Sequence, residues 1–205
     1  MKARISVLTA VMTLLVSVSG FSGETLSLGE AIPKADVEMK NVDGRKLTIN
    51  AVKGEKGTLV IFSCNHCPFV KAWQDRIVRI CNTYREKGVG VIMVNSNDPE
   101  KYPSDGFQHM KKQAEREGYE FPYVVDATSA VARAFGASRT PEAFLFDAAG
   151  KLVYHGAIDD NPYKPKKVKE TYLRDALKAL LAGNEIPVKN TRSVGCSIKY
   201  RRAGL

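Results

Sequence analysis

The chain has 205 residues, of which 44% are hydrophobic and 26% charged, and its formal net charge is +9. This length suits a single domain with a sizeable core. Because the sequence lacks the groove-reading motifs and interleaved aromatic residues of nucleic-acid-binding proteins, we expect no nucleic-acid partner. We attribute the charge to a solvated basic surface or to loose attraction to anionic membranes.

Residues 1–23 have the three parts of a secretory signal peptide. Lys2 and Arg4 precede an apolar stretch, residues 5–18, which small residues follow. A membrane anchor is the alternative to a cleaved signal peptide. The apolar stretch has about 14 residues, however, and roughly 20 are needed to span a bilayer. We therefore expect cleavage near residue 23 and no stable membrane span in the mature chain. The protein would be exported, to the periplasm of a Gram-negative bacterium or otherwise by secretion, with a net charge of +9 − 2 = +7.

The mature chain opens with a predicted β-hairpin and a buried strand. Residues 36–49 alternate in polarity about Asp43 and Gly44, a pair that favours a two-residue turn. The short β-branched run at residues 58–63 is typical of a strand that is covered on both faces.

Two cysteines, Cys64 and Cys67, follow this strand directly, and a helical pattern follows them. Apolar residues recur at spacings of three and four from Val70 to Tyr84, which indicates one buried helix face. Residues 89–95 form a second apolar run. A strand, a helix and a strand with this spacing predict a parallel pair of strands.

The rest of the chain predicts further alternation of helices and strands, and then a tail. The expected elements are helices at 106–118, 130–135 and 170–181, a strand at 123–125, a hairpin of strands at 143–147 and 151–155, and no element in the tail at 184–205. This order predicts an α/β fold with a mixed central sheet and helices on both faces. The expected organisation is a signal peptide (1–23), one domain (24–183) and a tail (184–205) that carries Cys196.

The position of Cys64 and Cys67 favours redox chemistry. The first turn of a helix has unpaired N–H groups that stabilise a thiolate, which is the attacking form of cysteine. The spacing brings the two sulfurs within bonding reach. We expect Cys64 to be the exposed nucleophile and Cys67, one turn into the helix, to resolve the mixed disulfide.

A permanent disulfide and a zinc site are the alternatives for this pair. A disulfide between such near neighbours closes a small loop and stabilises the fold little. A closed zinc site needs a second pair of ligands at similar spacing, and the remaining cysteines, Cys81 and Cys196, are isolated. We therefore expect no metal, and the sequence gives no sign of a bound cofactor.

The strand, the two cysteines and the helix resemble the thioredoxin superfamily. The fuller pattern resembles its redoxin-like branch, which is related to the alkyl hydroperoxide reductase and thiol-specific antioxidant family. The matching stretches cover nearly all of the chain after the N-terminus: residues 64–70, 95–98, 121–123, 140–141, 158–160 and 195–199.

The resemblance implies a thioredoxin-like fold with an N-terminal hairpin and an insertion, at residues 97–137, before a cis-proline at Pro141. Thr140, which precedes this proline, would pair its backbone with a substrate peptide. His66 and Asn65 would tune the redox potential, since members with histidine at this place tend to be more oxidising than thioredoxin, at roughly −270 mV. The tuning would act by lowering the pKa of the first cysteine; an exposed histidine without such a role is the alternative.

Two positions depart from the family pattern. Relatives often carry a third cysteine just before the Thr-Pro pair, where this chain has Arg139, a residue that either adds positive charge to the site or is solvated. Thioredoxins carry a buried aspartate six residues before the first cysteine, where this chain has Thr58. Glu55 or Lys56, at the start of the strand, is the candidate replacement for proton transfer.

The tail residue Cys196 has two open interpretations. It is either a third redox thiol that can meet Cys64 or Cys67, or a small buried residue that helps the tail to dock. Cys81 lies on the inward face of the predicted helix and is expected to be core.

These features predict a thiol–disulfide oxidoreductase that acts on protein or small-molecule disulfides and dithiols and is reset by a redox partner. A peroxiredoxin-like antioxidant peroxidase is the first alternative, and that family carries Pro-x-x-x-Thr-x-x-Cys. Counting back from Cys64 gives Ile61 and Gly57, and counting back from Cys67 gives Cys64 and Val60, so neither cysteine fits. A non-catalytic binding module on the same scaffold is the second alternative.

Overall fold

The structure is a computed structural model and describes residues 25–201. Its helices and strands, in chain order, are β1 (Met39–Asn41), β2 (Lys46–Leu47), β3 (Gly57–Phe62), α1 (Pro68–Arg85), β4 (Val89–Asn95), α2 (Phe107–Glu117), β5 (Tyr123–Val125), α3 (Ala130–Phe135), β6 (Arg139–Thr140), β7 (Glu142–Phe146), β8 (Leu152–Gly156), α4 (Tyr172–Ala182) and β9 (Cys196–Ser197). The predicted signal peptide lies outside the described residues. Within residues 25–201, no helix is long and apolar enough to cross a bilayer.

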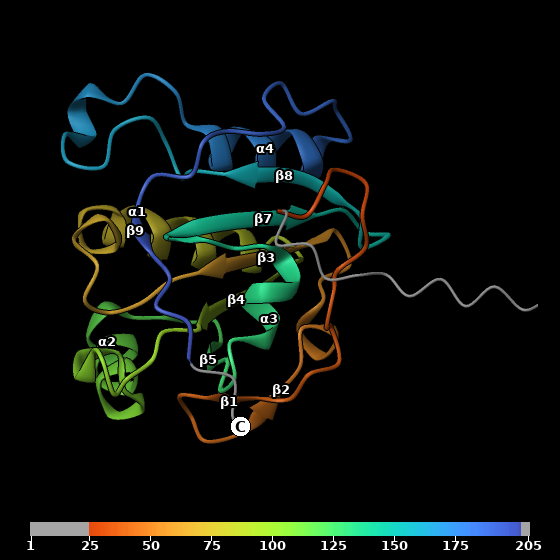
Figure 1. Cartoon of the computed structure of the whole chain (residues 1–205). Helices are drawn as coiled ribbons and strands as arrows, with labels where there is room; N and C mark the ends of the chain where they lie inside the picture. Colours follow the sequence, from red (N-terminus) through yellow and green to blue (C-terminus); the bar gives the residue numbers. More distant parts are fainter. Residues whose placement is uncertain (1–24, 202–205) are drawn as a thin grey trace, which may run out of the picture.

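Seven strands form a mixed sheet in the order β2-β1-β5-β4-β3-β7-β8 (Figure 1). β4 pairs in parallel with β3 on one side and with β5 on the other, and the remaining pairings are antiparallel. The expected hairpins about Gly44 and Gly150 are both present, and each glycine has a positive φ that favours glycine at its turn. The mixed sheet and both hairpins are therefore confirmed.

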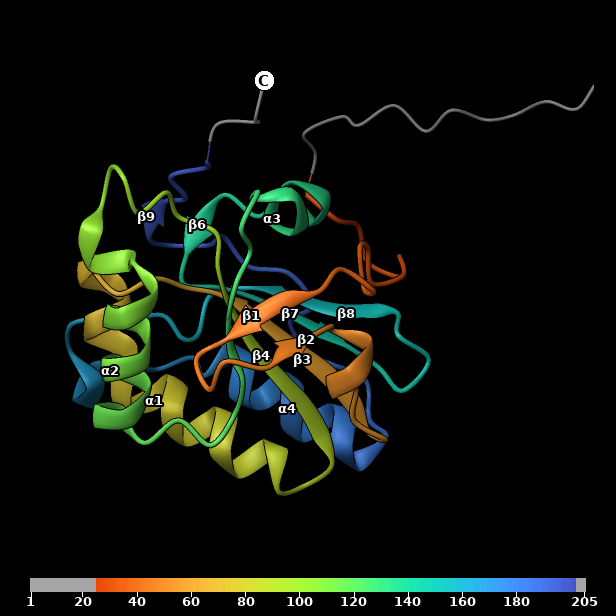
Figure 2. The same cartoon turned by 90° about the horizontal axis from the view of Figure 1, so that it is seen from below.

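Helices cover both faces of this sheet (Figures 1 and 2). On one face α1, α2 and α4 supply apolar side chains to a core that includes Trp73 and Leu177. On the other face α3 and the tail supply Phe135 and Ile198. The central strands β3 and β4 are buried along their whole length, which explains why their sequences are continuously apolar instead of alternating.

The sheet brings two distant loops to the end of β3, where the loop with the cysteines begins. β7 runs antiparallel to β3, with Glu142 opposite Phe62, so the start of β7 lies beside the end of β3. β4 is parallel to β3, so the loop that follows β4 also meets that end. The loops after β3, after β4 and before β7 therefore converge.

The sequence analysis missed two short strands, of which one lies in the tail. No element was expected after residue 184, but Cys196–Ser197 forms β9, which pairs antiparallel with Arg139–Thr140 in a second small sheet. Figure 2 shows β9 and β6 side by side, away from the main sheet. Strands of two residues carry no periodicity, so the sequence pattern could not reveal them.

Candidate active site

The two cysteines of the motif lie between β3 and α1. Cys64 follows the strand, and Cys67 is the residue that caps the N-terminus of α1, with Pro68 at the first helical position. Proline suits this position because its missing N–H would have no partner there. The expected placement at a helix N-terminus is confirmed, but Cys67 is the cap and not a residue one turn into the helix.

Both sulfurs are buried against the loop before β7. Cys64 Sγ lies 3.4 Å from the Thr140 hydroxyl, and the Cys67 thiol donates to the Thr140 carbonyl at 3.0 Å. The Thr140–Pro141 peptide bond is cis, as the family resemblance implied. Cys64 and Cys67 are each 0% exposed, so the expectation of an exposed Cys64 is wrong: the Thr140 loop and the tail cover the pair.

The two thiols differ in how well the site stabilises their anions. The pKa of Cys67 is lowered, chiefly by the hydrogen bond from the Cys64 thiol and also by Cys196 and the Val70 N–H in the first turn of α1. The pKa of Cys64 is raised, chiefly because it donates to Cys67, and further by burial and by the nearby Asp105 carboxylate. Because the Cys64 thiol donates to Cys67, the two thiols titrate as a pair, and a lowered pKa of Cys64 stays a prediction.

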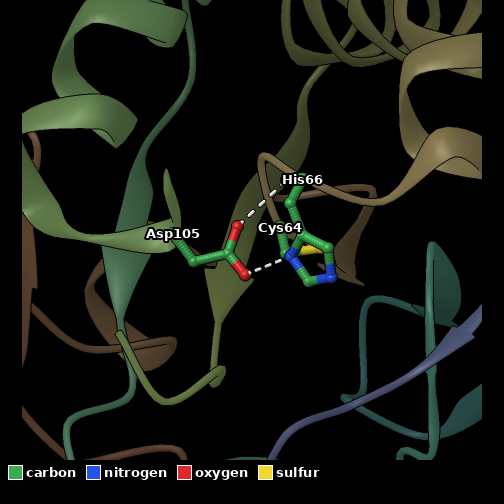
Figure 3. A group of neighbouring side chains, drawn as sticks. All are labelled: Cys64, His66 and Asp105. Atoms are coloured by element: carbon green, nitrogen blue, oxygen red, sulfur yellow. Dashed lines mark hydrogen bonds and ion pairs between the residues drawn. The ribbon is translucent and has the colours of Figure 1, made fainter. Parts of the chain in front are cut away.

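A buried carboxylate that the sequence analysis did not single out organises the turn between the cysteines. Asp105 is 1% exposed, and its Oδ1 accepts the backbone N–H groups of Asn65 at 2.8 Å and His66 at 3.0 Å. Its Oδ2 lies 2.5 Å from His66 Nδ1 and accepts Asn97 Nδ2 at 2.8 Å (Figure 3). Because loops at the carboxyl ends of neighbouring parallel strands meet, a carboxylate in the loop after β4 was the pattern that could have found it.

His66 and Asn65, the expected tuning residues, are held by this network. His66 points its Nδ1 at Asp105, with the Cys64 sulfur behind its ring in Figure 3, and stacks on Tyr102 with the ring centroids 4.3 Å apart. Asn65 is buried; its amide donates to the Ser104 carbonyl at 2.8 Å, and its oxygen accepts the Tyr123 hydroxyl at 2.9 Å. Both residues thus fix the turn that carries the cysteines.

The carboxylate of this site does not come from the start of β3. Glu55 and Lys56 are exposed and precede β3, whereas the cysteines follow it. A strand of this length spans about 20 Å, so neither residue can move a proton at Cys64. The suggested replacement for the aspartate at Thr58 is therefore wrong, and the buried carboxylate beside the cysteine comes from Asp105 instead.

Three groups at the site have the chemistry of metal ligands. The ligand atoms of Cys64, His66 and Asp105 lie within 4.8 Å of one another. The carboxylate and the imidazole, however, are 2.5 Å apart, which is hydrogen-bond distance and too short for two ligands that each lie about 2.0–2.2 Å from one tetrahedral zinc ion. Both carboxylate oxygens also accept other donors, so this arrangement serves the turn better than it would serve a metal.

The third thiol near the site belongs to the tail. Cys196 lies opposite Thr140 in the pairing of β9 with β6, packs against the cluster of Cys64, Cys67 and Val70, and is partly buried. Arg139, for which the sequence analysis left two roles open, is exposed beside Cys196. Its positive charge opposes the rise in the pKa of Cys196 that burial and Cys67 cause.

The fourth cysteine is remote from this chemistry. Cys81 is 0% exposed on the inward face of α1 and packs in the core with Trp73 and Ile77. Burial alone raises the pKa of its thiol, as expected for a core residue. Of the four cysteines, the structure therefore brings three together at the candidate site.

Known proteins resemble this chain in sequence and in fold. A crystal structure described as an uncharacterized conserved protein from Geobacillus kaustophilus is 43% identical, with a TM-score of 0.81, over 87% of this chain and 94% of that one. "Thiol-disulfide oxidoreductase ResA" of Halalkalibacterium halodurans is 26% identical over 115 residues, which are 56% of this chain and 61% of that protein. The match to that relative thus spans less than two thirds of its length.

The fold expected from the resemblance is also confirmed. The solution structure of a thioredoxin-like protein in the oxidized form superimposes with a TM-score of 0.59 at 21% identity, over 77% of this chain and 97% of that one. The model of the AhpC/TSA family, to which the redoxin-like branch is related, matches residues 28–155. Since that match covers more than half of the sequence, the chain belongs to the AhpC/TSA family.

Proposed function

We propose that the protein is an exported thiol–disulfide oxidoreductase whose Cys64 and Cys67 alternate between dithiol and disulfide through a mixed disulfide with the substrate. The observation that carries this proposal is the placement of two thiols at a helix N-terminus, where both contact Thr140 in the loop before β7. The family and the relative described as a thiol–disulfide oxidoreductase support an oxidoreductase. A permanent structural disulfide has less support, because so short a loop stabilises little.

The electrostatics argue for Cys67 as the attacking sulfur. The hydrogen bond from the Cys64 thiol, together with the Val70 N–H, lowers the pKa of Cys67, whose proton otherwise bonds to the Thr140 carbonyl, and the thiolate is the form that attacks a disulfide. Attack on a substrate disulfide would join Cys67 to one substrate sulfur and release the other as a thiolate. Cys64 would then give up its proton and attack Cys67, which forms the Cys64–Cys67 disulfide and releases the reduced substrate. The order expected from the sequence was the reverse.

The stabilised thiolate also bears on the redox potential. A thiolate is present only in the reduced state, so whatever stabilises it favours reduction of the disulfide. We therefore propose a potential more oxidising than the roughly −270 mV of thioredoxin. His66 and Asn65 would contribute by fixing the turn, and the substrates would be protein or small-molecule disulfides and dithiols, with a further redox partner that resets the pair.

Export is proposed from the sequence of residues 1–23. The charged start, the apolar middle and the small-residue end are typical of a cleaved signal peptide, and dithiol pairs that act on disulfides of other proteins suit oxidising compartments. Sequencing the N-terminus of the protein recovered from the cell envelope or the medium tests this. A start near residue 24 supports cleavage, and an intact Met1 contradicts it.

A glutathione redox titration with alkylation and mass mapping of all four cysteines tests the chemistry. We expect Cys64 and Cys67 to interconvert as a pair, with a midpoint above about −270 mV. The Cys81→Ala variant is the matched control, because its side chain is remote from the pair. If Cys64 and Cys67 never interconvert between dithiol and disulfide, the proposed oxidoreductase function is wrong, and a non-catalytic binding function must replace it. Stoichiometric turnover of hydrogen peroxide would instead favour the peroxidase.

A further inference from the structure

We propose that Cys196 is the third redox thiol of this site, that it exchanges disulfides with Cys67, and that it connects the buried pair with solvent. The inference deepens the proposed function and rests on it. It depends on three features: the way the tail is held, the order of the three sulfurs, and the difference in their burial.

The tail is held tightly on the loop that lies against the cysteines. Thr140 faces Cys196 in the antiparallel pairing, and a Cβ added at Gly195 would lie 2.2 Å from the Thr140 carbonyl oxygen. Only glycine therefore permits this approach. On the other side of β9, the Lys199 N–H donates to Asn97 Oδ1 at 2.7 Å, and Ile198 is buried in the core.

This position is the one that a substrate chain would need. An extended peptide adds to a sheet edge through backbone hydrogen bonds, and β9 makes such a pairing with the residue before the cis-proline. The tail therefore places its own cysteine where the sulfur of a substrate would lie. An entering chain must displace β9 or react with the cysteine that β9 carries.

The sulfurs are arranged with Cys67 in the centre. The Cys67 thiol donates to the carbonyl of Thr140, the residue that faces Cys196 across the pairing, while Cys64 contacts the Thr140 hydroxyl. Cys67 interacts with both other thiols, and Cys196 packs against the cluster of Cys64 and Cys67. Cys67 is therefore the sulfur that both disulfides would share.

The three thiols differ in burial, and this difference is why an exchange between them would be useful. Cys64 and Cys67 are both 0% exposed, whereas Cys196 is only partly buried. A disulfide between Cys64 and Cys67, the inner pair, cannot be reached by an outside thiol as long as β9 stays in place. A disulfide between Cys67 and Cys196 presents one sulfur on the solvent side.

The exchange balances without any added oxidant. Starting from the Cys64–Cys67 disulfide, Cys196 loses its proton and attacks Cys67 Sγ; the Cys67–Cys196 bond forms, and the Cys64–Cys67 bond breaks. Cys64 leaves as a thiolate and takes up a proton, so one disulfide and one thiol remain. An outside thiolate can then attack Cys196 Sγ and expel Cys67, the sulfur whose thiolate the helix N-terminus favours. The same steps run backward when the protein is a reductant, and Cys196 then forms the mixed disulfide with any substrate that β9 keeps away from Cys67.

Mass mapping of the Cys64→Ser variant after equilibration with glutathione tests the pairing. Because a tethered thiol has an effective concentration in the millimolar range or above, we expect a Cys67–Cys196 disulfide in place of a glutathione adduct at up to about 1 mM glutathione. Glutathione on Cys67 with Cys196 free would overturn the proposal. Cys81→Ala serves as the control, and circular dichroism verifies that each variant is folded.

A second measurement uses the Cys196→Ser variant with an intact inner pair. We expect this variant to form the Cys64–Cys67 disulfide, but to lose most of the rate at which dithiothreitol reduces it at neutral pH. An unchanged rate would show that movement of the tail alone opens the site, and the connecting role of Cys196 would be wrong. If the inner disulfide does not form in the unsubstituted protein, the proposed function itself fails, so the two failures are distinct.

Discussion

Asp105 Oδ2 lies 2.5 Å from His66 Nδ1, and this contact joins the loop after β4 to the turn that carries both cysteines. Together with the two backbone N–H groups bound by Oδ1, it means that one buried carboxylate sets the shape of the Cys-x-x-Cys turn. The same negative charge raises the pKa of Cys64. Asp105 is thus a positioning residue with an electrostatic effect on the nearer thiol.

Replacement of this carboxylate tests both roles. In Asp105→Asn, the amide nitrogen cannot accept the hydrogen bonds that one carboxylate oxygen now accepts, and we expect the free energy of unfolding to fall by about 1–3 kcal/mol. Loss of the negative charge should also lower the pKa of Cys64. Urea unfolding and the pH dependence of Cys64 alkylation, read by mass spectrometry, measure the two effects. Asp75→Asn, at an exposed position of α1, is the matched control.

Serine variants of the pair identify the attacking sulfur. If Cys67 attacks, then in a Cys196→Ser background the Cys64→Ser variant keeps the nucleophile and should accumulate a mixed disulfide with a small aromatic disulfide, while Cys67→Ser should react slowly. The reason is that the better stabilised thiolate is at Cys67. Release of the aromatic thiol gives the rate. A fast reaction of Cys67→Ser with a stable adduct on Cys64 would restore the order expected from the sequence.

The stability of the reduced protein should depend on pH through Cys67. A thiol with a lowered pKa in the folded state is ionised where the unfolded thiol still holds its proton, so folding gains stability as pH rises toward the unfolded pKa near 8.5. Between pH 6 and about 8.5 the free energy of unfolding should rise relative to Cys67→Ser, by at most about 1.4 kcal/mol per pH unit. Denaturant titrations of both reduced proteins measure this. Parallel pH profiles would contradict the stabilised thiolate.

Glu142 holds the loop before the cis-proline. Its Oε2 accepts the Ser138 and Arg139 N–H groups at 2.7 and 2.8 Å, and its Oε1 lies 2.7 Å from His155 Nε2. Glu142 is 1% exposed, so Glu142→Gln turns an acceptor into a donor in a buried site and should cost about 1–3 kcal/mol of unfolding free energy. Faster hydrogen exchange at Arg139 would locate the effect.

The control for this loop is Glu120→Gln, at an exposed ion pair with Arg85. Exposed ion pairs contribute about 0–1 kcal/mol, so a small change is expected there. If both variants lose the same stability, the loop does not depend on the buried carboxylate.

Cys81→Ala should affect stability and leave the redox chemistry alone. The side chain lies in the hydrophobic core, on the inward face of α1. Its truncation leaves a small cavity that should lower the free energy of unfolding by on the order of 1 kcal/mol. The midpoint of the inner pair should not change, because Cys81 contacts none of the other three thiols in the described structure. A shifted midpoint would place Cys81 in the redox system.

The sequence by itself determined the order of the helices and of the strands of the main sheet, and the position of Cys64 and Cys67. The apolar run at 58–63, the cysteines after it and the helical period from Val70 follow from local patterns, and the structure agrees with each. These features are readable because strand and helix periods are short, and because a helix N-terminus is defined by residues next to it in the chain.

Only the tertiary structure decided which groups surround the thiols. Asp105 lies 41 positions after Cys64 and Cys196 lies 132 positions after it, and both reach the site because parallel strands bring their following loops together and a two-residue strand docks the tail. The burial of Cys64, and the cap position that favours the thiolate of Cys67, also depend on where the helix begins and on what covers it. Contacts across such separations leave no local period in a sequence, so the fold was predictable while the electrostatics of its active site were not.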